Sequence, residues 1–149
     1  MDEFRELYQQ LILDHNQNPR NFKELQQATH SCDGHNPLCG DEVTIYLQVA
    51  DDVIKDISFT GSGCAISKAS TSIMTTILKG KTVVEARDIF DQFHRMVTKG
   101  EPISGEVGKL VVLAGVHKFP SRVKCAMLGW HTAMASLKET NSDKSVSTE

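Results

Sequence analysis

The sequence has no long hydrophobic segment and no surplus of positive charge, and these absences exclude two classes of protein. Its longest apolar run covers residues 110–116, whereas a helix needs about 20 apolar residues to cross a bilayer. The net charge of −3 gives no reason to expect nucleic acid as a partner. The N-terminus also lacks the basic and apolar regions of a secretory signal. We therefore expect a cytoplasmic protein that binds neither nucleic acid nor a membrane.

The sequence motifs of many nucleotide-binding and hydrolytic enzymes are missing as well. The sequence contains no GxGxxG, GxxxxGK[ST], HExxH or GxSxG. It has four cysteines but no CxxC, so neither a thioredoxin-like redox pair nor a zinc ribbon is indicated. In a reducing cytosol, cysteines serve metal binding or thiol chemistry more often than disulfides.

The pattern of apolar residues predicts a small α+β domain. Apolar side chains recur at helical spacing over residues 3–14, 65–79 and 82–97. Residues 42–50 and 53–60 alternate apolar and polar side chains, which predicts an antiparallel hairpin. Three further elements are expected: a short strand near 27–32, a short helical segment at 109–116, and a last helix capped by Ser121.

The length of 149 residues fits one domain with a normal core. We expect this domain to cover residues 1–138, with about three antiparallel strands and the helices packed on one face of the sheet. Residues 139–149 are polar apart from Val146, and we expect them to form a disordered tail.

Three of the cysteines lie at predicted element boundaries. Cys39 precedes the first hairpin strand, Cys64 opens a helix after a Gly-Ser-Gly break, and Cys125 falls in the first turn of the last helix. Cysteines that only pack usually lie in the middle of an element, on its apolar face. A helix N-terminus stabilises the thiolate, which is the form that binds metal or attacks sulfur.

A carboxylate accompanies the first of these thiols. Asp41 follows Cys39 by two residues, so both side chains of an extended segment point the same way. Three thiolates and one carboxylate suit tetrahedral zinc, and we expect the harder Asp41 to exchange most readily. From spacing alone, unrelated packing cysteines stay open as the alternative. Cys32 is interpreted as structural, and His35 stays open as a fifth ligand.

These segments together resemble the motifs of the IscU/NifU-N family of iron–sulfur scaffolds. The matching segments are Asn36-Pro37-Leu38-Cys39-Gly40-Asp41, Gly61-Ser62-Gly63-Cys64-Ala65-Ile66-Ser67 and Lys124-Cys125. The opening segment is also similar to that family's N-terminus, from Tyr8 through Asp14-His15 to Asn18-Pro19-Arg20-Asn21. The resemblance runs from residue 4 to about 138. It implies a SufE/NifU-like fold and a metal bound by Cys39, Asp41, Cys64 and Cys125.

Within the family, the sequence looks like the SufU branch. Lys124 stands where the general IscU pattern has a histidine, and the proline-rich chaperone motif of IscU is absent. The stretch between Cys64 and Cys125 is also long for IscU. SufU-type proteins are understood as zinc-bound, sulfurtransferase-like acceptors of persulfide sulfur from a SufS-type cysteine desulfurase. The resemblance thus implies Zn²⁺ as cofactor, Cys39 as sulfur acceptor, a downstream iron–sulfur scaffold as recipient, and a monomer.

Two other functions stay open. In an IscU-like scaffold, the same ligands would carry iron or a [2Fe–2S] cluster that is assembled there and transferred. A non-catalytic, zinc-stabilised binding module would unfold when the metal is removed, and none of its thiols would take up sulfur. Whether the chain acts as an enzyme in its own right also stays open, because its sulfur comes from the desulfurase.

Overall fold

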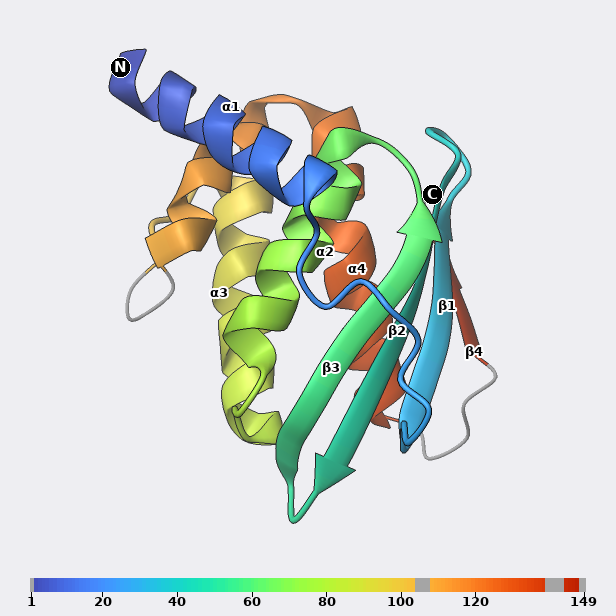
Figure 1. Ribbon diagram of the computed structural model, residues 1–149. Helices are drawn as coiled ribbons and strands as arrows, with labels where there is room; N and C mark the ends of the chain where they lie inside the picture. The colour runs from blue at the N-terminus through green and yellow to red at the C-terminus, as the bar shows by residue number, and fades with distance from the viewer. Residues whose placement is uncertain (1, 104–107, 139–143, 148–149) are drawn as a thin grey trace.

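The protein is a mainly antiparallel sheet covered by helices on one face (Figure 1). The computed structural model describes residues 2–103, 108–138 and 144–147. In chain order the elements are α1 (Asp2–Gln17), β1 (His30–Asn36), β2 (Asp41–Ala50), β3 (Val53–Ser62), α2 (Ala65–Leu78), α3 (Val83–Lys99), the 3₁₀ helix η1 (Gly108–Lys118), α4 (Pro120–Lys138) and β4 (Lys144–Ser147). The predicted α+β class, with helices on one face of the sheet, is confirmed.

The sheet has the strand order β3-β2-β1-β4. Its β1–β2 and β2–β3 pairs are antiparallel, as predicted, whereas β4 runs parallel to β1. The tail expected to be disordered covers residues 139–149. Of these, 139–143 and 148–149 lie outside the described residues, while Lys144–Ser147 form the fourth strand instead.

Two predicted boundaries were wrong. The first strand covers His30–Asn36 rather than residues 27–32, so it runs up to the Cys39 turn. The last helix begins at Pro120 and is not capped by Ser121, because proline fits the first helical turn, where its missing N–H has no acceptor. By contrast, the predicted capping box of α3 is present, with Glu85 N donating to Thr82 Oγ1 and Thr82 N donating to Glu85 Oε1.

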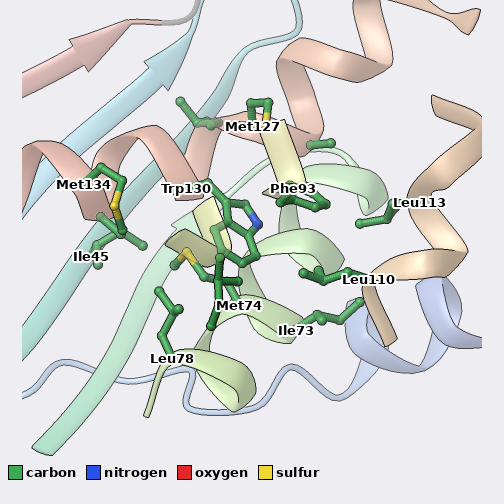
Figure 2. Packing of buried hydrophobic residues seen from close by; sticks show 14 of the residues in the cluster. Ile45, Ile73, Met74, Leu78, Phe93, Leu110, Leu113, Met127, Trp130 and Met134 are labelled. Atoms are coloured by element: carbon green, nitrogen blue, oxygen red, sulfur yellow. The ribbon is translucent and has the colours of Figure 1, made fainter. Parts of the chain in front are cut away.

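The core lies between the sheet and the helices, with α4 at its centre (Figures 1 and 2). Helix α4 contacts β1, β2, α2, α3 and η1. Its fully buried Trp130 stacks on Phe93 of α3 at 4.6 Å between ring centroids. The indole N–H of Trp130 donates to Ser70 Oγ of α2, so the one polar atom of this ring is satisfied inside the core.

The segment after α1 is tied to α2 by side-chain hydrogen bonds. The backbone N–H of Arg20 donates to Ser72 Oγ, and Ser72 Oγ lies 2.7 Å from Nδ1 of the buried His15. Asn21 Nδ2 donates to Thr75 Oγ1. These contacts hold α1 across α2 (Figure 1). Among the described residues, no helix is both long and apolar enough to span a membrane.

Candidate metal–thiolate site

The tight turn between β1 and β2 sets the positions of Cys39 and Asp41. Asn36 and Asp41 are the last paired residues of the two strands, and the backbone oxygen of Asn36 accepts hydrogen bonds from Cys39 N and Gly40 N. Gly40 has φ +75°, a left-handed conformation that glycine adopts without strain. The turn leaves Cys39 exposed, whereas Asp41 is 0% exposed at the start of β2.

The start of α2 brings Cys64 against Asp41. Cys64 is the N-cap residue, and its Sγ accepts a hydrogen bond from Ser67 N at 3.4 Å. Asp41 Oδ1 accepts from Cys64 N at 2.7 Å, and Asp41 Oδ2 lies 3.8 Å from Cys64 Sγ. A Cβ on Gly63 would lie 2.5 Å from Asp41 Oδ1, so only glycine leaves room for the carboxylate.

Helix α4 supplies the third thiol from the core side. Cys125 was expected in the first helical turn, but the start at Pro120 places it in the second, where it is 4% exposed. Its Sγ lies 3.6 Å from Cys39 Sγ and 3.8 Å from Asn36 Nδ2. The fold therefore brings together all four side chains that the sequence singled out.

Three thiolates and one carboxylate are a donor set that suits tetrahedral zinc. Candidate ligand atoms of Cys39, Asp41 and Cys125 all lie within 4.8 Å of one another, whereas Cys64 is outside this group and lies beside it through its contact with Asp41. With Zn–S of about 2.3 Å and Zn–O of about 2.1 Å, a tetrahedron has S···S edges of about 3.8 Å and S···O edges of about 3.6 Å. The observed 3.6 Å and 3.8 Å contacts are close to these edges.

The hydrogen bond between Cys64 and Cys125 shifts the pKa values of the two thiols in opposite directions. A hydrogen bond from the Cys125 thiol lowers the pKa of Cys64 to about 7, and the N–H of Ser67 at the start of α2 adds to this effect. Holding that proton raises the pKa of Cys125, and burial raises it further. The expectation that a helix N-terminus favours the thiolate thus agrees with Cys64, but it is wrong for Cys125, which lies beyond the first turn.

Burial distinguishes the two candidate ligands Cys39 and Asp41. Asp41 is buried, its Oδ1 accepts a backbone hydrogen bond, and Gly63 lets the carboxylate pack closely. Cys39 is exposed on the turn. The structure therefore gives no support to the expectation that Asp41 exchanges most readily, and exposure points to Cys39 as the ligand an incoming group can reach.

The remaining candidates lie outside the cluster. Strand alternation puts His35 on the exposed face of β1, opposite to buried Asn36. It does not belong to the group formed by Cys39, Asp41 and Cys125. Cys32 is 1% exposed in the core, in agreement with its structural interpretation.

Sequence reasoning missed the roles of two residues beside the cluster. Asn36 was read only as part of a motif, although its side chain reaches Cys125. Tyr8 lies within the predicted helix of residues 3–14, where nothing indicates that its hydroxyl interacts with Arg122 and Cys64 or that burial raises its pKa. A stripe of apolar residues carries no signal that separates such a tyrosine from a packing residue.

Comparison with known proteins agrees with this picture. The chain is 41% identical over 125 residues to the zinc-dependent sulfurtransferase SufU of Bacillus subtilis, covering 83% of this chain and 84% of that protein. It is 36% identical over 141 residues to the iron–sulfur cluster assembly scaffold protein IscU of Streptococcus pyogenes, covering 94% and 88%.

A solved structure and a family profile extend the comparison. A putative iron–sulfur cluster assembly scaffold protein for the SUF system from Fervidobacterium islandicum superposes with a TM-score of 0.82 at 34% identity, covering 89% of this chain and 97% of that one. The profile of the NifU-like N terminal domain matches residues 7–139. The chain therefore belongs to the NifU-like N-terminal domain family, as its cysteine motifs predicted.

Proposed function

We propose that this protein accepts persulfide sulfur for iron–sulfur cluster assembly, with a SufS-type cysteine desulfurase as donor and a downstream scaffold as recipient. One observation carries the proposal: Cys39 is exposed, while Asp41 and Cys125 beside it are buried. One thiol can therefore meet a partner while the rest of the cluster stays in place. The similarity to the zinc-dependent sulfurtransferase of B. subtilis supports the same assignment.

The ligands of the resident metal are Cys39, Asp41, Cys64 and Cys125 in this proposal. Zinc bound there keeps the sulfurs as thiolates and adds no redox chemistry of its own. Two of these side chains accept backbone hydrogen bonds: the N–H of Cys64 donates to Asp41, and the N–H of Ser67 donates to the sulfur of Cys64. These hydrogen bonds fix the ends of the loops that carry Asp41 and Cys64 before any metal binds.

Cys39 performs the sulfur transfer. Its thiolate attacks the outer sulfur of the persulfide on the desulfurase. A new S–S bond forms at Cys39 Sγ, while the S–S bond on the enzyme breaks and its cysteine leaves as a thiolate. The reaction is an exchange between sulfurs, so it needs neither an oxidant nor a reductant.

The cluster scaffold is the second candidate, because the S. pyogenes and F. islandicum proteins are named as scaffolds. The same three sulfurs and one carboxylate would hold iron, since thiolates suit both metals. Anaerobic addition of iron and sulfide separates the two. A scaffold develops the visible absorption of a [2Fe–2S] cluster, and a sulfur acceptor does not.

The direct test is the rate of alanine production by a SufS-type desulfurase with and without the zinc-loaded protein. We expect a large rise in rate with the wild-type chain and one added sulfur atom on Cys39 by mass spectrometry. Cys39→Ala should abolish both effects. Cys32→Ala is the matched control, because this cysteine is buried in the core away from the cluster. No rise in rate with the wild-type protein would refute the acceptor function.

A further inference from the structure

Asn36 is a buried amide placed where the two halves of the site meet. It is the last residue of β1, pairs with Asp41 across the sheet, and is 0% exposed. Its backbone oxygen holds the Cys39 turn through Cys39 N and Gly40 N. Its side chain turns the other way, to the sulfur of Cys125 on α4. One residue thus contacts the backbone of the turn that carries the exposed thiol and the sulfur of the buried one.

The hydrogen bonds to the cluster are unevenly shared. Asp41 accepts from Cys64 N, Cys64 Sγ accepts from Ser67 N, and Cys125 Sγ accepts from Asn36 Nδ2. Within residues 2–103, 108–138 and 144–147, the sulfur of Cys39 contacts the thiol of Cys125 and receives no hydrogen bond from an N–H group. Of the three thiols, the exposed Cys39 is therefore the one whose sulfur accepts no hydrogen bond from an N–H group.

Packing alone does not account for an amide at this position. Among the described residues, Asn36 Oδ1 is buried without a hydrogen-bond partner, which is unfavourable for a polar atom. Leucine has nearly the same shape and no polar atom to satisfy. A residue that breaks this local rule without a packing gain is expected at a functional site.

We propose that Asn36 is a positioning residue whose side-chain N–H holds the Cys125 sulfur as a fixed ligand, leaving Cys39 as the thiol that leaves and reacts. The inference rests on the proposed ligand set, because it takes Cys125 as a metal ligand. Groups that hydrogen-bond to metal ligands commonly tune both affinity and electronic structure. The bond withdraws electron density from the sulfur and fixes its position. Its loss therefore makes Cys125 a more strongly donating ligand, and the accompanying loss of positioning is what lowers metal affinity.

Co²⁺ is a suitable probe, because its sulfur-to-metal absorption bands report the donor strength of the thiolates. The variants are Asn36→Leu, which keeps the shape of the side chain, and Asn36→Ala, which does not. Both lack the N–H, so both should move the charge-transfer band to longer wavelength and weaken metal binding about 10- to 100-fold. Ser58→Ala is the control, because it also removes a buried, unpartnered oxygen but lies on β3 in the core.

A second measurement records which cysteine leaves the metal, and so becomes alkylated, first. Limited alkylation of the zinc-loaded protein, followed by peptide mass spectrometry, should modify Cys39 first in the wild type. In Asn36→Leu the share of modified Cys125 should rise, although leucine covers that sulfur as well as asparagine does. A general loss of folding would raise modification of the core Cys32 in parallel, and the inference expects no such rise.

The outcomes separate this inference from the proposed function. A wild-type protein without a thiolate-to-Co²⁺ band would refute the proposed ligand set itself. A normal wild-type band, with the same band energy, affinity and alkylation order in both Asn36 variants, would overturn the role of Asn36 alone. A band shift in Asn36→Ala but not in Asn36→Leu would also overturn it, because it would trace the effect to lost volume.

Discussion

At the scale of single residues, depth distinguishes the four ligand candidates. Asp41 and Cys125 are buried, Cys64 is half-buried at the start of α2, and Cys39 is exposed on a turn. A buried carboxylate is costly unless it is hydrogen-bonded, and Asp41 has its backbone donor in Cys64 N. The exposed thiol is thus the member of the set that can move without uncovering an unpaired charge.

Gly63→Ala tests how closely the Cys64 loop must approach Asp41. The added Cβ would lie 2.5 Å from Asp41 Oδ1 and 3.0 Å from Asp41 Cγ, so the carboxylate or the loop must shift. We expect zinc affinity to fall about 10- to 100-fold, as for the loss of other groups that position ligands. Competition with a chromophoric chelator measures the change.

Gly115→Ala is the matched control for this substitution. A Cβ there has no neighbour within 4 Å, so affinity should be unchanged and stability should change by no more than about 0.5 kcal/mol. Equal zinc affinity in Gly63→Ala and the wild type would show that the carboxylate does not need its present position.

At the scale of elements, α1 is held on α2 by a buried histidine. His15 lies against Ser72, and burial lowers its pKa from 6.5, with the nearby charge of Arg20 lowering it further. Ser72 Oγ accepts the N–H of Arg20, so its own hydrogen is available for Nδ1 of a neutral imidazole. The docking of α1 therefore depends on an uncharged His15.

A pH dependence of stability follows from this contact. In the unfolded chain His15 binds a proton as the pH falls through about 6.5, while the folded protein resists protonation to lower pH. The free energy of unfolding should therefore decrease below pH 6.5, and this part of the decrease should be missing in His15→Gln. Urea denaturation from neutral to acidic pH, with chelator present to exclude metal release, measures the slope.

His131 also contributes to the loss of stability in acid. Burial and the neighbouring His94 lower its pKa too, so part of the acid slope should remain in the His15 variant. Parallel slopes in the variant and the wild type would mean that His15 is not kept neutral by the fold.

Helix α3 is joined to the domain by one aromatic contact in particular. Phe93 is fully buried and stacks on Trp130, so Phe93→Ala should lower the free energy of unfolding by about 3–5 kcal/mol. Val84→Ala is the control on the same helix, because Val84 is 78% exposed and should cost no more than about 0.5 kcal/mol. Chemical denaturation provides both values, and a small loss for Phe93→Ala would mean that α3 packs independently of the core.

At the scale of the whole molecule, the core and the site are separate. The buried cluster extends through the sheet, α2, α3, η1 and α4, and the candidate ligands lie at one end of it. A domain with such a core does not need a metal to supply its main stabilising surface.

Metal removal should therefore leave the fold intact. We expect the chelated protein to keep its far-UV circular dichroism and a cooperative unfolding transition. Zinc at 100 times its dissociation constant should add about 2.7 kcal/mol to the free energy of unfolding. Complete unfolding on chelation would instead support the zinc-stabilised binding module.

Local patterning determined most of the elements. The predicted segments 42–50, 53–60, 65–79 and 82–97 correspond to β2, β3, α2 and α3, because each has a regular apolar repeat. Strand β1 has no such repeat, since it holds mostly polar and small residues and exists through its pairing with β2. Its extent could therefore not be read from its own residues.

The sequence by itself determined the family and the four candidate ligands, because three cysteines and an aspartate stand in its motifs. Only the tertiary structure decided what distinguishes them. Asn36 and Cys125 are 89 positions apart, and the contact between them depends on how α4 packs against β1. Burial and hydrogen bonding are properties of packed neighbours, so the fold alone determines which thiol is held and which is exposed.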